Sequence, residues 1–187
     1  MIPPLVAAIV TSRLKQPAAP FVGEGKDHLL KRLLDMDMLP DTVGIIGSRE
    51  FEPLAHVTNF VGRLYKGTLV VSGGARGVDR TSVAAARKLG YPWHEELPDK
   101  SIPSPARFFE RNQRLVDYVH QRDGLIVAFA LTTDSTSIGT GGTRHAVKYA
   151  TKVGAPVITI LRDGAGEYHV LFNTAAEECR MPEEPLY

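Results

Sequence analysis

The sequence predicts an α/β protein with a doubly wound, mostly parallel sheet and helices on both of its faces. The main evidence is a regular alternation between Thr42 and Leu161, where short apolar runs of strand type are followed by longer segments of helical periodicity. Glycine-rich loops that join several of these runs to the next helix are a second indication. Strands separated by helices pair in parallel through right-handed crossovers, which gives this fold class.

The bounds of the expected elements follow from these patterns. Strands are expected at Thr42–Gly47, Thr68–Ser72, Tyr91–Glu95, Gly124–Phe129 and Pro156–Leu161, with Tyr168–Phe172 as an added edge strand. Helices are expected at Leu54–Tyr65, Gly77–Leu89, Ala106–Gln121 and Gly142–Val153. Gly90 is the expected end of the second helix, because glycine readily adopts the left-handed conformation of a helix C-terminus.

The beginning of the chain has a different character. Prolines interrupt its first residues, and Asp27–Leu39 then places apolar side chains at helical spacing behind an aspartate that can cap the helix. We therefore expect residues 1–40 to form an extension with one amphipathic helix, which docks on the core or on a second subunit. Residues 41–187 are expected to form the α/β domain.

Composition sets bounds on the function. A hydrophobic content of 43% and a charged content of 23% are typical of a globular protein, and a net charge of +1 gives no overall basic field to attract nucleic acid. Cys179 is the single cysteine, which excludes an intrachain disulfide, and the histidines lack metal-ligand spacing, so we expect no metal. Since the sequence contains neither a membrane-spanning run nor a signal peptide, we expect a cytoplasmic protein without membrane contact.

Three loops at the carboxyl ends of the expected strands have the composition of an anion site. Gly47-Ser48-Arg49 follows the first strand, Ser72-Gly73-Gly74-Ala75-Arg76-Gly77-Val78-Asp79 follows the second, and Gly139–Thr143 precedes the last helix. Glycines expose backbone N–H groups, and a helix that begins at such a turn adds the positive end of its dipole. Because ligands of doubly wound sheets bind at this edge, the sequence predicts a phosphate-bearing ligand there.

Side chains near these loops complete the predicted site. Arg49 and Arg76 are suited to phosphate, and Arg111 and Asn112 would reach over the cleft from the third helix, although Arg107, Arg111 and Arg114 could equally form a solvated basic face. The full set of predicted ligand contacts is Gly47, Ser48, Arg49, Ser72, Gly73, Gly74, Arg76, Gly77, Asp79, Arg111, Asn112, Gly139, Thr140, Gly141, Gly142 and Thr143. Tyr91 and Trp93 could stack on a base, with core packing as the default.

The catalytic residues are left open by the sequence. Asp79 either holds the glycine turn by accepting backbone N–H bonds, which we favour, or acts as a general base or ribose-hydroxyl acceptor. Glu50 and Asp134 are further candidate acids near the cleft. The absence of a Gly-Lys-Ser/Thr sequence excludes a Walker-type NTPase. Ala75 occupies the position of the middle glycine of the dinucleotide-binding fingerprint, which counts against that motif. Glu95 and Glu96 nevertheless lie near the position expected for an acid that binds a ribose hydroxyl, so dinucleotide binding remains an alternative.

Taken in order, these motifs resemble the SLOG superfamily, which groups the DNA-processing protein A fold with the LOG "lysine decarboxylase-like" proteins, and within it the small YspA- and YpsA-related proteins. The resemblance covers about Thr42 to Leu161 and implies a Rossmann-like nucleotide-binding domain. LOG proteins cleave the N-glycosidic bond of nucleoside monophosphates with the glutamate of a Pro-Gly-Gly-x-Gly-Thr-x-x-Glu motif. Counting along the matching loop gives Thr143 or Ala146 instead, so LOG-type hydrolysis does not carry over directly.

The DNA-processing protein A branch shares the Ser-Gly-x-Ala-Arg-Gly-x-Asp and Phe-x-x-Arg-Asn sequences, the latter here at Phe108 to Asn112. The leading hypothesis is therefore a protein that binds a phosphorylated nucleotide or nucleotide derivative. Hydrolysis of an N-glycosidic or phosphate-ester bond is an additional activity for which the sequence identifies no acid–base pair. One alternative is a module for single-stranded nucleic acid. Another is a nucleotide-sensing subunit that acts through a partner bound by Asp27–Leu39. No cofactor is identified, and the resemblance favours a homodimer.

Overall fold

The structure is a computed structural model, and it describes residues 39–132, 138 and 141–173. Its strands are β1 (Thr42–Gly47), β2 (Leu69–Ser72), β3 (Trp93–Glu95), β4 (Leu125–Leu131), β5 (Val157–Arg162) and β6 (Tyr168–Asn173). Its helices are α3 (Ala55–Gly62), α4 (Val78–Leu89), α5 (Ala106–His120) and α6 (Gly142–Lys152). The expected alternation of strands and helices is therefore confirmed over this part of the chain.

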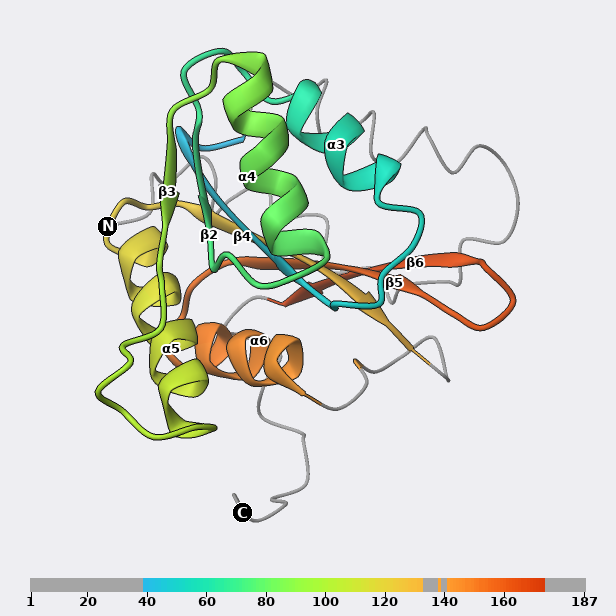
Figure 1. Cartoon of the computed structure of the whole chain (residues 1–187). Coiled ribbons are helices and arrows are strands. Elements are labelled where there is room, and N and C mark those ends of the chain that lie inside the picture. The colour runs from blue at the N-terminus through green and yellow to red at the C-terminus, as the bar shows by residue number, and fades with distance from the viewer. Residues whose placement is uncertain (1–38, 133–137, 139–140, 174–187) are drawn as a thin grey trace.

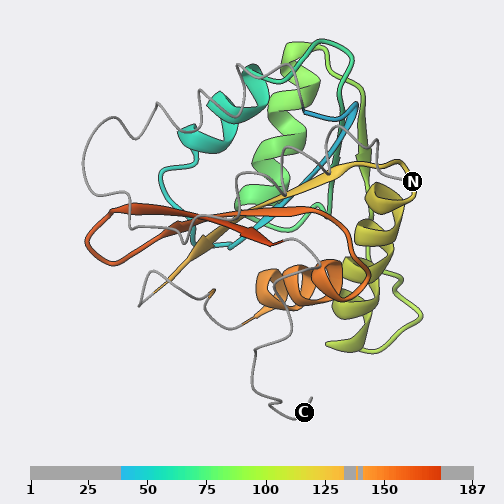
Figure 2. The same ribbon diagram turned by 180° about the vertical axis from the view of Figure 1, so that it is seen from behind.

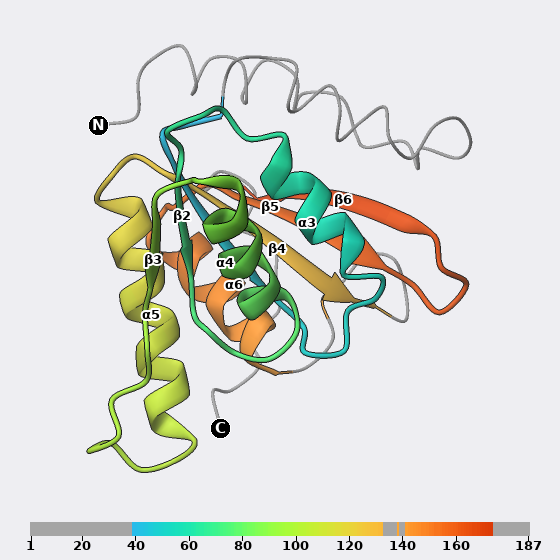
Figure 3. The ribbon, with the colours of Figure 1, turned by 45° about the horizontal axis from the view of Figure 1, so that its top comes forward.

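All the strands form one sheet in the order β3-β2-β1-β4-β5-β6. Pairing is parallel from β3 through β5, and β6 pairs antiparallel with β5. Helices α3 and α4 cover one face of the sheet, and α5 and α6 cover the other (Figures 1 and 2). The turned view shows α3 and α4 side by side across the strands (Figure 3). The protein thus has the doubly wound α/β architecture that the sequence predicts.

Alternation along the strands divides the apolar side chains between two cores. In β1, Val43 and Ile45 face α3 and α4, whereas Ile46 faces α5 and α6. In β4, Val127 and Phe129 belong to the first core, and Ile126 and Ala128 to the second. Side chains on successive residues of a strand point to opposite faces, so runs that are apolar throughout are required for a sheet buried on both sides.

The strand order reverses between β1 and β4, because β1 pairs with β2 on one side and with β4 on the other. The two crossovers that leave these strands therefore run on opposite faces of the sheet. Their loops diverge and leave a crevice at the carboxyl ends of the strands, where ligands of such sheets bind. This is the edge that carries the predicted site.

Most differences from the sequence expectations are at element ends. Helix α3 ends at Gly62, three residues before the expected Tyr65, and β4 extends two residues beyond the expected Phe129. Strand β3 begins at Trp93 and not at Tyr91, because the N–H of Tyr91 donates to Ala86 O of α4 at 2.9 Å; the Tyr91 hydroxyl donates to Leu64 O at 2.7 Å in the core. None of the described helices is both long and apolar enough to cross a membrane. The expected helix Asp27–Leu39 lies outside the described residues except for Leu39, which packs against the first core.

Candidate functional site

The first loop of the predicted site lies at the end of β1, against β4 and the start of α4. Gly47 has no room for a side chain, since an added Cβ would lie 2.6 Å from Val78 Cγ2 and overlap Phe129 O. Ser48 N donates to Phe129 O at 2.9 Å, and the Ser48 hydroxyl accepts the N–H of Glu50 at 3.1 Å. The Ser48 hydroxyl therefore orders its own loop.

The second loop packs directly on the first. Gly77 has a φ of +84°, and a Cβ there would lie 2.7 Å from both Cα and O of Arg49. Gly77 is thus required both by its conformation and by the close approach of two backbone segments. Ser72, the last residue of β2, is fully buried, and its hydroxyl donates to Ile45 O at 2.5 Å. The Ser72 side chain serves the sheet, whereas the glycines that follow it form the surface of the site.

Asp79 joins the two loops. Its carboxylate accepts Gly47 N–H at 3.1 Å and Ala75 N–H at 3.4 Å, and it pairs with Arg111 Nη1 at 3.2 Å. Burial raises the pKa of the Asp79 carboxyl, while the Arg111 charge and the two backbone donors act in the opposite direction. This is the structural role that the sequence favoured for Asp79.

Arg111 is buried to an extent unusual for an arginine, with 8% of its side chain exposed. Its guanidinium also occupies the space beside Gly73, where any Cβ would overlap it. The Nε atom has no hydrogen-bond partner, and the side chain lines a cavity beside the glycine loop. The guanidinium therefore pairs with Asp79 and also forms part of the cavity wall.

That cavity has a volume of about 400 Å³ and lies between the first two loops, the loop after β3 and the beginning of α5. Its lining combines cationic side chains, the glycine-rich backbone and an apolar wall. The lining residues are Arg49, Gly73, Gly74, Ala75, Arg76, Leu97, Pro98, Phe108 and Arg111. The described lining holds three arginines and no carboxylate, so the cavity is suited to an anion that carries an apolar group.

The apolar wall is the part of the site that the sequence analysis missed. Leu97 is 60% exposed, and together with Pro98 and Phe108 it forms the apolar part of the cavity lining. The available signal was position, because Leu97 and Pro98 follow β3 at the same sheet edge as the glycine loops. An exposed leucine next to cationic side chains is characteristic of a ligand-facing surface.

Arg76 interacts with one of the candidate acids. Its Nη2 lies 2.9 Å from Glu50 Oε1, and the two side chains are 72% and 70% exposed. Exposed pairs of this kind contribute little to stability, roughly 0–1 kcal/mol. The contact therefore leaves Arg76 available to a stronger anion, and it places Glu50 at the rim of the cavity.

The third loop is described only from Gly141 onward, and Gly139, Thr140 and the candidate acid Asp134 lie outside the described residues. Gly141 has a φ of +112° and precedes the first turn of α6. The amide of Asn112 donates to Gly142 O at 3.0 Å, so α5 fixes the start of α6. Thr143 is half-buried in that first turn. Asn112 thus positions a helix, and the described cavity lining does not include it.

The row of arginines on α5 is not a free basic face. Arg114 pairs with Glu110 at 2.7 Å and with Glu96 at 3.4 Å, while Arg111 is buried against Asp79. Arg107 lies over the ring of Phe108 at 5.0 Å. Within the described part of the chain, no group of three or more histidine, cysteine, aspartate or glutamate side chains could hold a metal ion.

Comparison with known proteins supports the fold. No family model matches the sequence, and no curated protein matches it. Among solved structures, the chain is similar to DNA processing protein A (DprA) from Streptococcus pneumoniae, with a TM-score of 0.50 and 17% identity over 68% of this chain and 51% of that chain. The protein TM1055 is also similar, with a TM-score of 0.44 and 20% identity over 62% of this chain and 71% of that chain.

At this level of identity the similarity to DNA processing protein A concerns the fold alone. The chain has a Rossmann-like α/β fold, as the alternation of strands and helices in its sequence predicted. It spans about half the length of the pneumococcal protein. Ligand, activity and assembly must therefore be argued from the site itself.

Proposed function

We propose that the protein binds a phosphorylated nucleotide or a nucleotide derivative in the cavity beside the Gly73-Gly74 turn. The observation that carries this proposal is the convergence of Arg49, Arg76 and Arg111 on one cavity of about 400 Å³, whose lining also includes the apolar Leu97, Pro98 and Phe108. A ligand that satisfies both parts of the lining needs an anionic group and a flat or apolar one. A nucleotide has both.

The phosphate end of the ligand would lie against the glycine turn. Gly73, Gly74 and Ala75 line the cavity with backbone, and α4 begins just beyond them at Val78. Arginine presents its donors in a planar fork that matches phosphate oxygens, and buried charge-assisted hydrogen bonds are stronger than exposed ones. Arg111 would supply the buried contact, with Arg49 and Arg76 at the more exposed rim.

The base end of the ligand would lie against Leu97, Pro98 and Phe108. These side chains offer area for stacking and van der Waals contact but few directional hydrogen bonds. Affinity is therefore expected to depend on the phosphate more than on the identity of the base. A site that recognises one particular base would instead show a strong dependence of affinity on the base.

Hydrolysis of an N-glycosidic or phosphate-ester bond is a separate prediction and does not form part of the binding proposal. Asp79 is buried and holds three donors, and Glu50 is paired with Arg76, so neither has the environment of an uncommitted acid or base. Incubation with nucleoside monophosphates, followed by measurement of released base and released phosphate, tests for activity. Loss of such activity in Glu50→Gln would identify Glu50 as its acid or base.

Binding is tested by thermal unfolding in the presence of nucleoside mono- and diphosphates, inorganic phosphate and unphosphorylated nucleosides. Phosphorylated compounds should raise the Tm, because a ligand that binds only the folded state stabilises it. Loss of one charge-assisted contact costs about 1.5–3 kcal/mol, so Arg76→Ala and Arg49→Ala should each weaken binding roughly 10- to 100-fold. Arg63→Ala, an exposed position just after α3, is the matched control.

Two results would contradict the proposal. One is an unchanged Tm with every phosphorylated compound. The other is binding of a single-stranded oligonucleotide with steep salt dependence and without competition from mononucleotides, which would instead favour the nucleic-acid module. The pairing of Arg114 with Glu110 and Glu96 counts against that module, since it removes one cation from the surface that the module would use.

A further inference from the structure

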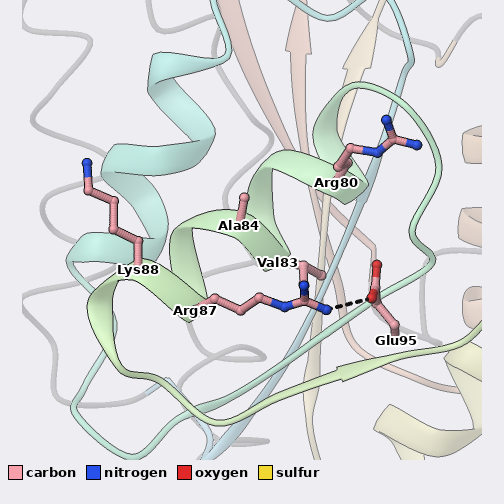
Figure 4. A pocket seen from close by; sticks show the side chains of 6 residues that line it. All are labelled: Arg80, Val83, Ala84, Arg87, Lys88 and Glu95. Atoms are coloured by element: carbon pink, nitrogen blue, oxygen red, sulfur yellow. Dashed lines mark hydrogen bonds and ion pairs between the residues drawn. The ribbon is translucent and has the colours of Figure 1, made fainter.

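A second concave surface lies on the outer side of α4, next to the edge of the sheet. It has a volume of about 500 Å³ and is lined by Arg80, Val83, Ala84, Arg87, Lys88 and Glu95. Figure 4 shows Arg87 and Glu95 directed toward each other across it, with Arg80 toward the start of α4 and Lys88 at the other end. We call this surface the α4–β3 groove. The proposed nucleotide site does not use it.

The groove runs beside a free strand edge. In the described part of the chain, β3 is the end strand of the sheet and pairs with β2 alone. Pro92 O accepts Val70 N–H, and Glu96 N–H donates to Ser72 O, each at 2.9 Å. Because backbone groups alternate in direction along a strand, the N–H and C=O groups of Trp93 and Glu95 face away from β2. No strand of the described residues pairs with these peptide groups, so they can bond to an added strand.

The side chains of β3 divide between the two faces of the sheet. His94 stacks on Tyr118 of α5, with ring centroids 4.3 Å apart. Trp93 and Glu95 face α4, where Arg87 lies 3.8 Å above the indole ring and 3.1 Å from the Glu95 carboxylate. A strand added outside β3 would therefore direct every second side chain toward α4 and into the groove.

The charge of the groove indicates which side chains of an added strand would fit it. Arg80, Arg87 and Lys88 contribute three positive charges, against the single carboxylate of Glu95. Arg80 and Lys88 form no ion pair with another described residue. Val83 and Ala84 provide an apolar floor between the cations. Acidic side chains are the complement of this surface, and exposed Trp93 and Arg87 are residue types enriched where proteins bind.

We propose that the α4–β3 groove binds an extended acidic segment of a partner protein, which adds a strand to the free edge of β3 and pairs its carboxylates with Arg80, Arg87 and Lys88. Strand addition uses backbone hydrogen bonds for affinity and alternate side chains for specificity. A single-stranded nucleic acid fits the groove less well, because Arg87 covers one face of the Trp93 ring and because bases make no use of the free peptide groups. This proposal is independent of the nucleotide site.

Trp93 is the single tryptophan of the chain and lies at the edge in question, so its fluorescence reports binding directly. The probe is the peptide Glu-Thr-Glu-Val-Glu-Thr-Glu, acetylated and amidated at its ends, and the comparison is the same peptide N-methylated at alternate residues. N-methylation removes the hydrogen bonds of strand addition and keeps the charge. We expect saturable binding of the first peptide and at least about tenfold weaker binding of the second.

The double variant Arg80→Glu/Lys88→Glu should weaken peptide binding about tenfold or more, because it places like charges opposite the carboxylates. Lys148→Glu/Lys152→Glu on α6 makes the same change in net charge on the opposite face of the sheet and should leave binding unchanged. Both pairs are exposed, and circular dichroism checks that each variant folds.

Three results would overturn the proposal: no binding of the acidic peptide, equal binding of the N-methylated peptide, or equal weakening by both double variants. Binding of a short oligothymidylate that depends on Arg80 and Lys88, with none of the acidic peptide, would assign the groove to nucleic acid instead. Thermal shifts with nucleotides are measured on the same variants, so the result for the groove is read separately from the result for the nucleotide site.

Discussion

Arg111 is charged and yet almost fully buried, and nothing in the pattern of α5 indicates this. Its spacing with Arg107 and Arg114 fits a solvated face equally well. Burial becomes favourable only because Asp79, 32 positions earlier in the chain, lies beside it and because Gly73 leaves space for the guanidinium. The sequence could therefore identify Arg111 as a site residue from its motif, but the ion pair required the fold.

The dependence of this ion pair on Gly73 gives a prediction. Gly73→Ala places a Cβ into the Arg111 guanidinium, which must then leave Asp79. An uncompensated buried charge costs about 3–5 kcal/mol, so the free energy of unfolding should fall by an amount of this order, and nucleotide binding should be lost. Urea unfolding and thermal shift measure the two effects.

Gly164→Ala is the control for this substitution, because a Cβ at Gly164 meets nothing within 4 Å. It should change stability by less than about 0.5 kcal/mol and leave binding intact. If Gly73→Ala proves as stable as the parent protein and still binds nucleotide, Arg111 is not held where the structure places it.

At the scale of elements, the sequence was sufficient to predict where strands and helices lie along the chain. It was not sufficient to predict the direction in which the last strand pairs with its neighbour. Apolar runs located β1, β2, β4 and β5 to within two residues because each is buried on both faces of the sheet. Tyr168–Phe172 was expected as an edge strand, and the structure confirms it as β6. Its antiparallel direction depends on the short turn from Arg162 to Tyr168, in which Asp163 N donates to Glu167 O and Gly166 N donates to Asp163 O, each at 3.0 Å.

The side chain of Asp163 adds further hydrogen bonds in the turn between β5 and β6. Its Oδ1 accepts the N–H of Ala165 at 2.9 Å and of Glu167 at 2.8 Å, and its Oδ2 lies 3.0 Å from His169 Nε2. The hydrogen bond with His169, followed by the backbone N–H of Glu167, holds the pKa of Asp163 below its ordinary value of 3.8. A carboxylate with a lowered pKa stabilises the fold above its unfolded-state pKa and loses this contribution as the pH falls through its folded-state pKa.

Asp163→Ala should therefore destabilise the protein at neutral pH, and the difference from the parent protein should shrink as the pH falls below 3.8. Denaturant unfolding at a series of pH values measures this. Asp41→Ala, at an exposed aspartate just before β1, is the comparison. A difference for Asp163→Ala that stays constant across the pH range would show that the charge of Asp163 does not support the turn.

At the scale of the whole molecule, the fold explains how a chain with a net charge of +1 presents a strongly cationic site. The strand order brings the loops after β1 and β2 and the start of α5 to one edge, so Arg49, Arg76 and Arg111 meet although 62 positions separate the first from the last. The net charge of the chain does not reveal this cluster, because acidic residues elsewhere in the sequence balance the arginines. The topology brings them together at one edge of the sheet, and among the described strands it leaves β3 at the end of the sheet, beside the cations of α4. The homodimer expected from the family resemblance stays a prediction, which light scattering in solution would test.

The two apolar cores of the described residues predict that residues 39–173 fold as a unit. Each face of the sheet is covered by its own pair of helices, and Leu39 packs against the first core, so a fragment that begins there keeps that contact. We expect this fragment to unfold cooperatively, with a Tm within a few degrees of the full chain, since loss of about 1 kcal/mol shifts the Tm of a domain of this size by only 2–8 °C. It should also bind nucleotide as tightly as the full chain. Calorimetry and thermal shift on both proteins measure this, and a fragment that folds only when residues 1–38 are restored would place part of the core in the N-terminal extension.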